Sequence, residues 1–478
     1  MKKIILFALA LVVAVHANPQ SLWKKSKLKI SPPVCYAAKR IEKKFVPPSE
    51  ELMLKFRQEE KKSEIIVHYS LFPKEAKQAF EYATGIWECI IESPVPIYLQ
   101  ANWLRLGRNV LGSCGPSDYR VNFDCAPRKN LYYPIAIVEK LAKKEITGPD
   151  VPDIIGEFNR NIPWYFGTDG NTPDSLYDFV TVVLHEIGHG LGFTGFFFVN
   201  EQLGTYGYSR IGQVANFDVM VAKNTGDRLI DSTIYKNPSE ELKKALESGL
   251  LYAQSPAAIN ISGGEVPRLY SPFEWNYGSS VYHLNDPSYP AGTANSLMTH
   301  ALGRAEAVHD PGPLTTGIMA DIGWKHMFIN FEPLKDREHI TPLNFNVLIE
   351  SDYEIDTSSL YVVYSYDNFR THIDSVSLNP LTDTKTFTAE LVPPAGVSEV
   401  SYFIKAGDKK ERIFRKPGMA PDEAYTVRIG PDNEPPQIAH EPIKYYFLAT
   451  NELRLTAQVT DNLGVDTVFA EYKRNGIQ

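Results

Sequence analysis

The stretch that most constrains this chain is VVLHEIGHGLGFTG, which runs from Val182 to Gly195. The apolar run YDFVTVVL leads into it, and this pattern predicts a buried helix. On a helix, His185 and His189 are four residues apart and project from one face, while Glu186 is offset beside them. The sequence therefore brings two imidazoles and one carboxylate to a common point.

The ends of this helix can be predicted from the residues around it. Asp174 or Ser175 can cap its start, and Gly190 and Gly192 mark where it ends, because glycine readily leaves the helical conformation.

The spacing of these side chains suits a zinc ion. Neutral imidazoles are good zinc ligands, and a catalytic zinc site uses three protein ligands with one open position. Zinc lowers the pKa of water, and a carboxylate such as Glu186 can then accept a proton from that water. The alternative is an ordinary buried helix whose histidines bond to the backbone. The apolar run before the motif and the glycines after it disfavour that alternative, as does the secretory signal peptide at the start of the chain, which is described next.

The first 17 residues, MKKIILFALALVVAVHA, combine two lysines with a short apolar run and end in small residues. This pattern is typical of a secretory signal peptide. The run is too short for a spanning helix, which needs about 20 apolar residues. We expect a secreted, extracellular protein with no integral membrane association.

Composition limits the remaining function classes. The chain has 478 residues, of which 43% are hydrophobic and 22% charged, so it can form two or three packed domains. Its net charge of -8 gives no general attraction for nucleic acid.

The four cysteines suit disulfides in an oxidising compartment. Cys114 and Cys125 flank a short loop, and we expect them to pair. Cys35 and Cys89 can pair with each other, or Cys35 can have another role.

Residues 18–62 are rich in lysine, arginine and proline and show little apolar periodicity. We expect a removable or loosely held pro-segment. A solvated extension with no role is the alternative.

Residues 63–330 alternate between strand-like and helical patterns. SEIIVHYS, VPIYLQANW and DIIGEFN are strand candidates, and FPKEAKQAFEYATGIWECII has apolar residues on one helical face. GIMADIGW is expected to form the last helix of this region. The order of these elements predicts a mixed α/β layer.

With these elements in place, HEIGHGLG resembles the metzincin zinc proteases, in which the glycine at the position of Gly192 ends the helix. FPKEAKQAFEYATGIWE resembles the first helix of that clan, and DIIGEFN its substrate-aligning edge strand. NSLMTH resembles the turn whose methionine, here Met298, lies under the metal. The resemblance covers residues 63–330 and implies an α+β zinc protease domain that cleaves proteins or peptides, with Glu186 as general base.

Gly195 departs from the common metzincin pattern, which has a third metal ligand six residues after His189. In leishmanolysin-like metzincins a long insertion displaces the third histidine to a position before the methionine turn. GSSVYHLNDPSYPAGTANSLMTH is similar to that region, so the resemblance implies His283 as third ligand and an insertion of about 196–282. Asp218, His300 and His309 are the competing candidates. Met298 can also be an ordinary core methionine.

Beyond Trp324 the chain changes character. Short strand-like runs at near-regular spacing predict a β-sandwich over 336–430, resembling fibronectin type III or immunoglobulin-like modules. A proline-rich linker leads into residues 433–478, which start a second, truncated sandwich, so we expect a fragment of a longer protein. These modules could bind a surface or matrix.

We therefore expect a secreted zinc endopeptidase with β-sandwich accessory modules. A non-catalytic adhesion protein on a protease-like scaffold is the alternative, and a zinc hydrolase of non-peptide bonds is a third. We also consider that Cys35, in SPPVCYAAK, ligates the zinc as a thiolate and holds the enzyme latent. The competing interpretation is a disulfide between Cys35 and Cys89.

Overall fold

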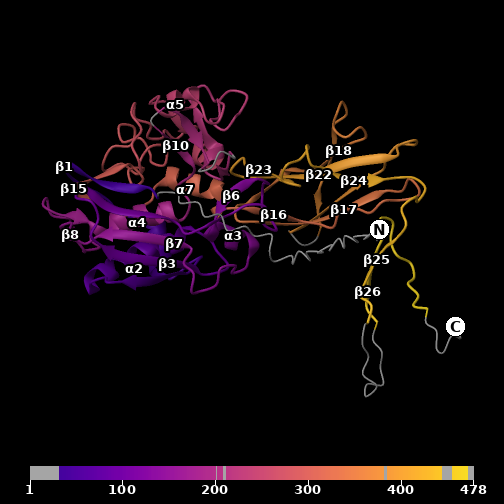
Figure 1. The fold of residues 1–478 in the computed structure, drawn as a ribbon, viewed down its shortest axis with the longest axis horizontal. Helices are drawn as coiled ribbons and strands as arrows, with labels where there is room; N and C mark the ends of the chain where they lie inside the picture. The colour runs from indigo at the N-terminus through magenta and orange to yellow at the C-terminus, as the bar shows by residue number, and fades with distance from the viewer. Residues whose placement is uncertain (1–31, 201, 208–211, 382–384, 444–454, 472–478) are drawn as a thin grey trace, which may run out of the picture.

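The protein forms an α+β domain followed by β modules (Figure 1), which confirms the expected fold class at that level. The structure, a computed structural model, describes residues 32–200, 202–207, 212–381, 385–443 and 455–471. The signal peptide expected at 1–17 lies outside these residues. No helix in the described part of the chain is both long and apolar enough to span a membrane.

A mixed sheet of six strands is the frame of the first domain. Its strands are β1 (Val34–Val46), β2 (Ile65–Ser70), β3 (Ile97–Leu104), β4 (Val110–Pro116), β7 (Ile154–Asn159) and β15 (Ala301–Val308). They are ordered β15-β1-β4-β7-β3-β2. Strands β2, β3 and β7 run parallel, β4 is antiparallel to β7 and to β1, and β1 is parallel to β15.

Two long helices pack against this sheet. Helix α2 (Lys74–Ile90) buries Ala76, Ala79, Phe80, Ala83 and Trp87, which confirms the apolar face predicted from its sequence. Helix α4 (Phe179–Gly190) is buried along its whole length. The indole Nε1 of Trp87 donates a hydrogen bond to the carbonyl of Leu184 at 3.0 Å, so α2 is fixed directly against α4.

The stretch expected to be a loosely held pro-segment is well packed where it is described. Strand β1 is hydrogen-bonded to β4 on one side and to β15 on the other, and helix α1 (Glu50–Arg57) follows it with Ser49 as its cap. Its apolar periodicity is low because β1 is stabilised by backbone pairing on both sides and buries few of its side chains. Whether residues 18–62 are removed stays a prediction.

The strand DIIGEFN was expected at the edge of the sheet, and this expectation is wrong. Strand β7 lies between β3 and β4, and β4 is the strand that meets β1. The sequence pattern of a single strand does not reveal its neighbours, because pairing order depends on distant segments.

Residues 196–282, the expected insertion, fold as short elements. They are β10 (Phe197–Val199), β11 (Gly204–Tyr206), β12 (Val214–Ala215), the 3-10 turn η2 (Asp218–Met220), β13 (Val221–Lys223), α5 (Glu240–Leu246), β14 (Leu251–Ala253) and α6 (Pro256–Ile261). Buried side chains such as Phe217, Leu242 and Leu251 join the same apolar core as α2 and α4. The segment is thus part of the first domain.

The remaining elements of the first domain are short. They are β5 (Tyr119–Arg120), β6 (Leu131–Pro134), α3 (Ile135–Ala142), β8 (Trp164–Tyr165), β9 (Tyr177–Asp178), α7 (Pro313–Met319) and the turn η3 (Ala320–Trp324). The last two correspond to the final helix expected at GIMADIGW. A left-handed φ of 129° at Gly323 kinks its end.

A second apolar core begins at Met327 and belongs to the β module, which we define as residues 327–429. One sheet contains β16 (Met327–Asn330), β17 (Leu343–Ser351), β21 (Thr386–Leu391) and β20 (Asn379–Pro380). The other contains β19 (Asp374–Ser377), β18 (Ile355–Ser365), β22 (Glu399–Asp408), β23 (Ile413–Lys416) and β24 (Tyr425–Arg428). Alternating burial along β17 places one face of that strand in the shared core.

The segment expected to start a second sandwich contributes one pair of strands to the described residues. Strand β25 (Gln437–His440) pairs antiparallel with β26 (Ala457–Thr460). Both strands are largely exposed.

Candidate metal centre

Helix α4 starts later than its sequence suggests. Asp178, not Asp174 or Ser175, is its cap, and the Asp178 carboxylate accepts a hydrogen bond from the backbone N–H of Thr181 at 2.8 Å. The predicted start was wrong because Tyr177 and Asp178 form β9, which pairs with β8 and keeps the chain extended up to the cap. The predicted end is confirmed: α4 ends at Gly190, and Gly192 has a left-handed φ of 116°.

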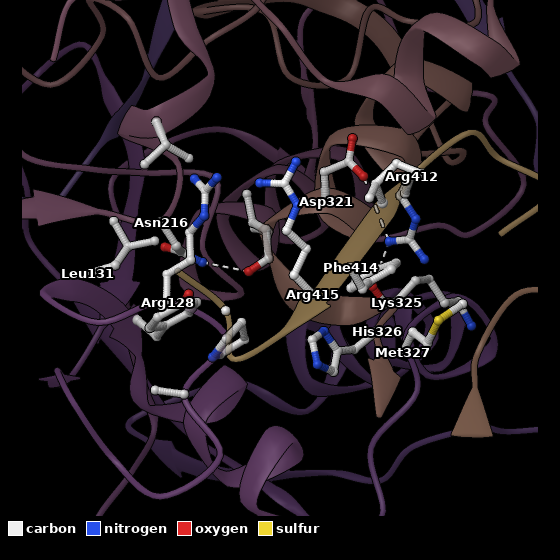
Figure 2. A pocket seen from close by; sticks show the side chains of 18 of the residues that line it. Arg128, Leu131, Asn216, Asp321, Lys325, His326, Met327, Arg412, Phe414 and Arg415 are labelled. Atoms are coloured by element: carbon white, nitrogen blue, oxygen red, sulfur yellow. Dashed lines mark hydrogen bonds and ion pairs between the residues drawn. The ribbon is translucent and has the colours of Figure 1, made fainter. Parts of the chain in front are cut away.

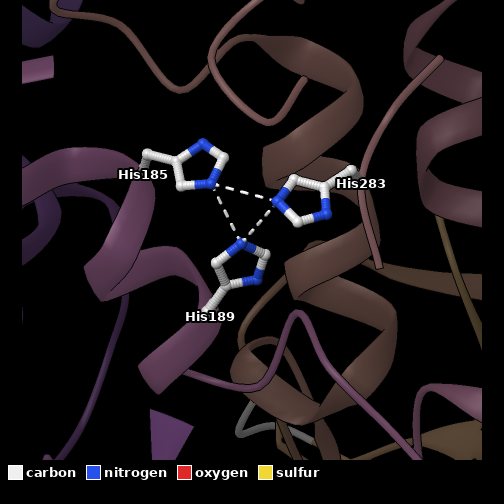
Figure 3. A group of neighbouring side chains, drawn as sticks. All are labelled: His185, His189 and His283. Carbon is white, nitrogen blue, oxygen red and sulfur yellow. Dashed lines mark hydrogen bonds between the residues drawn. The ribbon is translucent and has the colours of Figure 1, made fainter. Parts of the chain in front are cut away.

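Helix α4 directs two histidines towards a third from a distant segment. The Nε2 atoms of His185 and His189 are 3.0 Å apart, and those of His189 and His283 are 3.1 Å apart. The Nε2 atoms of His283 and His185 are 3.2 Å apart (Figure 3). All three side chains are buried. The structure thus brings together the three residues expected as ligands.

The other ring nitrogen of each histidine settles its tautomer. Nδ1 of His185 lies 2.7 Å from the carbonyl of Leu297, and Nδ1 of His189 lies 2.8 Å from that of Phe193. Nδ1 of His283 lies 2.8 Å from the carbonyl of Ser279. A carbonyl only accepts, so each Nδ1 carries the proton and each Nε2 presents a lone pair.

Three lone pairs therefore face one another with no proton between them. This arrangement is repulsive unless a cation lies among the nitrogens. A zinc ion bound at about 2.0–2.1 Å to tetrahedrally arranged nitrogens sets those nitrogens about 3.3 Å apart, close to the separations found here. The donor set and its spacing thus fit zinc. Carbonyl bonds to Nδ1 are the usual support of zinc-binding histidines.

Burial keeps these imidazoles neutral. It lowers the pKa of His185 to about 4, although its bond to Leu297 acts in the opposite direction. Burial, followed by the neighbouring imidazoles, also lowers the pKa of His189 and His283 well below the usual range. Neutral imidazole is the form that binds metal ions.

A buried carboxylate connects the insertion to His283. Asp218 accepts hydrogen bonds from the backbone N–H groups of Phe196 at 3.0 Å and Ala215 at 3.1 Å. The hydroxyl of Tyr282, next to His283, donates to Asp218 at 2.9 Å. A Cβ atom at Gly195 would lie 2.0 Å from the Asp218 Oδ1 atom. Position 195 is therefore glycine because the Asp218 carboxylate occupies the space beside it.

Met298 and Gly188 meet beneath the histidines. Met298 is fully buried, and a Cβ atom at Gly188 would lie 3.0 Å from its sulfur. The preceding residue, Leu297, supplies the carbonyl that orients His185. The methionine turn is thus packed directly on α4, between the two histidines of the helix.

Glu186 is fully buried next to His185. One carboxylate oxygen is 3.3 Å from the backbone N–H of Cys35, and the other has no hydrogen-bond partner in the described chain. Burial raises the pKa of the Glu186 carboxyl well above its usual value. A Cβ atom at Gly112 in β4 would lie 2.9 Å from Glu186 Cγ, so glycine at this point makes room for the base.

Cys35 is buried beside His185 and Glu186. Ligand atoms of these three residues lie within 4.8 Å of one another. Burial and the nearby Glu186 carboxylate raise the pKa of the Cys35 thiol. Cys35 and Cys89 are both unpaired in the structure.

The bridge expected between Cys114 and Cys125 is not formed. Cys114 is buried in β4, where its sulfur packs close to Gly190, whereas Cys125 is exposed. The short spacing of these cysteines suggested a closed loop, but the intervening strand β5 pairs with β6 and directs the chain elsewhere.

The competing ligand candidates have other partners. His300 lies 2.6 Å from the carboxylate of Asp286 and stacks on Tyr270. His309 bonds to Asp178, the cap of α4, at 2.9 Å. In the described part of the chain, the histidine group contains none of the three candidates His300, His309 and Asp218.

Three features of this site were missed from the sequence: the carbonyl partners, the Asp218–Tyr282 contact and the Asp178–His309 pair. Every residue has a backbone carbonyl, so residue types do not indicate which carbonyl a histidine contacts. The glycine at position 195 was the one available signal for Asp218.

A family model described as SPBPB7E8-like matches residues 101–203, which include His185, Glu186 and His189. No curated protein matches the chain. Among solved structures, a variant superoxide reductase (neelaredoxin) from Ignicoccus hospitalis is 8% identical over 22% of this chain and 81% of its own, with a TM-score of 0.16. A likeness this low carries no argument about fold or activity.

Proposed function

We propose that this chain is a secreted zinc-dependent endopeptidase of metzincin type, similar to the leishmanolysin-like proteases. The observation that carries the proposal is the meeting of three unprotonated Nε2 atoms beside a buried carboxylate. His185, His189 and His283 would hold the ion, and Glu186 would be the general base. We also propose that the β module is a fibronectin type III-like or immunoglobulin-like domain.

The side chains divide the chemistry between them. When bound, zinc supplies Lewis-acid polarisation and lowers the pKa of water towards neutrality. Glu186 accepts a proton from the attacking water and donates it to the leaving amine. Burial raises the pKa of Glu186, so its carboxyl retains an accepted proton more readily than an exposed carboxylate does.

The pairing of strand β1 with strand β4 is the observation that favours a peptide as the substrate. Strand β1 passes the site in extended conformation, antiparallel to β4, with Cys35 opposite Gly112. The backbone of β4 can therefore hold an extended peptide by main-chain hydrogen bonds next to Glu186. This favours peptide cleavage over hydrolysis of other bonds.

The same strand supports the latency hypothesis. While β1 is paired with β4, a substrate cannot use β4, and the Cys35 sulfur lies beside His185 and Glu186. We propose that β1 must be displaced or cut before substrates enter. A thiolate from Cys35 would be a strong additional zinc ligand.

The test uses the purified secreted protein. Zinc content and cleavage of a mixed peptide library are measured before and after limited proteolysis, with a chelator control. We expect about one zinc per chain, and cleavage that increases after proteolysis and stops with chelator. A protein that binds zinc but cleaves no peptide after removal of β1 would favour the adhesion alternative.

Latency is tested separately by mapping the cysteines under non-reducing conditions. A free Cys35 is the expected result, and a bridge from Cys35 to Cys89 would end the thiolate hypothesis without affecting the protease proposal.

A further inference from the structure

A cavity lies between the first domain and the β module, and none of the three histidines lines it. Its volume is about 440 Å³, within the range of small-molecule sites. The first domain lines it with Arg128 and Arg228, and the β module lines it with Arg415 and Lys416. In Figure 2 the side chains of Arg128 and Arg415 extend into this space.

The two parts of the chain meet closely at this cavity. A Cβ atom at Gly418, in the β module, would lie 1.8 Å from the carbonyl oxygen of Pro127 in the first domain. Lys129 and Glu423 form an ion pair of 2.8 Å between the same two loops. The walls of the cavity are therefore held in a defined arrangement.

The cavity carries an excess of positive charge. Two of its cations have carboxylate partners: Lys325 lies 2.9 Å from Glu92, and Arg412 lies 2.7 Å from Asp408. Asp321, the carboxylate in the lining, accepts hydrogen bonds from Ser255 and Ala257 and lies 3.7 Å from Arg412.

The other four cations lack such partners. No described carboxylate lies within ion-pair distance of Arg128, Arg228, Arg415 or Lys416. Arg228 and Arg415 donate to the backbone carbonyls of Val219 and Ala420, each at 3.0 Å, which orients them but neutralises nothing. All four side chains are exposed on one side, and partial loss of hydration, followed by the nearby Arg128 guanidinium, lowers the pKa of Arg228.

We propose that this cavity binds a compact polyanion, a molecule that carries two or more sulfate, phosphate or carboxylate groups. Guanidinium groups match such oxyanions through paired hydrogen bonds. The four cations come from two parts of the chain and line one cavity, so a ligand with several anionic groups can contact more of them than a single anionic group can.

The position of the ligand has a structural consequence. Arg128 and Arg228 come from the first domain, while Arg415 and Lys416 come from β23 of the β module. An anion that contacts both pairs would strengthen the junction between the two parts. We therefore expect binding to raise the melting temperature of the whole chain.

The test measures binding by calorimetry and thermal shift on the full chain. The probes are inorganic phosphate, inorganic sulfate, citrate and a sulfated disaccharide, each at two salt concentrations. We expect at least one multivalent probe to bind saturably, one per chain, and to raise the melting temperature. The identity of the best probe shows which acid the site prefers.

Variants localise the binding. Arg128→Gln and Arg415→Gln should each weaken it about tenfold, because hydrogen bonds to charged groups are strong. The matched control is Arg370→Gln, an exposed arginine of the β module outside the cavity, which should bind normally. Absence of saturable binding, or equal losses in the control, would overturn the proposal. Zinc and proteolysis play no part in this measurement.

Discussion

The two cores of this chain bury different kinds of side chain. The first core contains ionisable groups with no opposite charge beside them, among them His185, Glu186 and His283. The core of the β module is apolar apart from serines, and its buried charges, Asp408 and Arg412, form an ion pair. Burying an unpaired ionisable group costs several kcal/mol, so among the described residues the first core is the one that retains such destabilising groups. On the proposed function, this difference distinguishes the domain that would perform chemistry from the module that would support it.

The strongest test of this comparison is the loss of a buried histidine. His283→Ala removes one of three converging Nε2 atoms, and we expect it to abolish both zinc binding and peptide cleavage. His300→Ala is the matched control, because His300 lies near the same turn but bonds to Asp286. Metal content after dialysis is measured beside activity. Stoichiometric zinc in the His283 variant would mean that another residue completes the site.

The next test separates the base from the ligands. Glu186→Gln keeps the shape of the side chain but cannot accept the proton, so the rate should fall by about 10²–10⁴. Zinc content should be unchanged, because Glu186 is not one of the three histidines. Wild-type activity in this variant would remove Glu186 from the mechanism.

The β module should respond differently. Ile404 is fully buried in β22, and Ile404→Ala should destabilise the module by about 2–5 kcal/mol. Zinc content and cleavage should stay close to wild type if the module is only a support. Glu399→Ala, an exposed change on the same strand, is the control for stability. A loss of zinc in the Ile404 variant would show that the two cores depend on each other.

The sequence predicted the parts of the site that depend on local spacing. The places of His185, Glu186 and His189 follow from helical periodicity, and Gly192 ends the helix as expected. His283 came from a resemblance and could not be derived from spacing, because a folded insertion lies between it and His189.

The errors concern pairing between distant segments. Asp178 caps α4 because β8 and β9 pair, and β7 lies inside the sheet because β4 takes its outer side. The packing of β1 between β4 and β15 was hidden by its polar composition. Such pairings depend on backbone hydrogen bonds, which side-chain patterns record only weakly.

The smallest expected effect concerns a buried carboxyl outside the histidine group, that of Asp153. Asp153 accepts a hydrogen bond from the backbone N–H of Tyr98 at 2.8 Å, and burial together with the nearby Glu139 raises its pKa to about 8. In the unfolded chain its pKa is about 3.9. The folded protein therefore holds a proton that the unfolded chain releases between these values. The stability that Asp153 contributes is complete below about pH 4 and is lost as the pH rises through 8.

Asp153→Asn cannot ionise, and its amide can still accept from Tyr98 and donate to Glu139. Its melting temperature should fall less steeply than that of the wild type between pH 4 and 8, and should exceed it by about 2–4 °C at the upper end. Peptide cleavage should not change. Parallel melting curves for the two proteins would place the proton on another group. A flatter curve with unchanged cleavage would show that the first core also buries ionisable groups that take no part in cleavage, so burial by itself does not identify the chemistry.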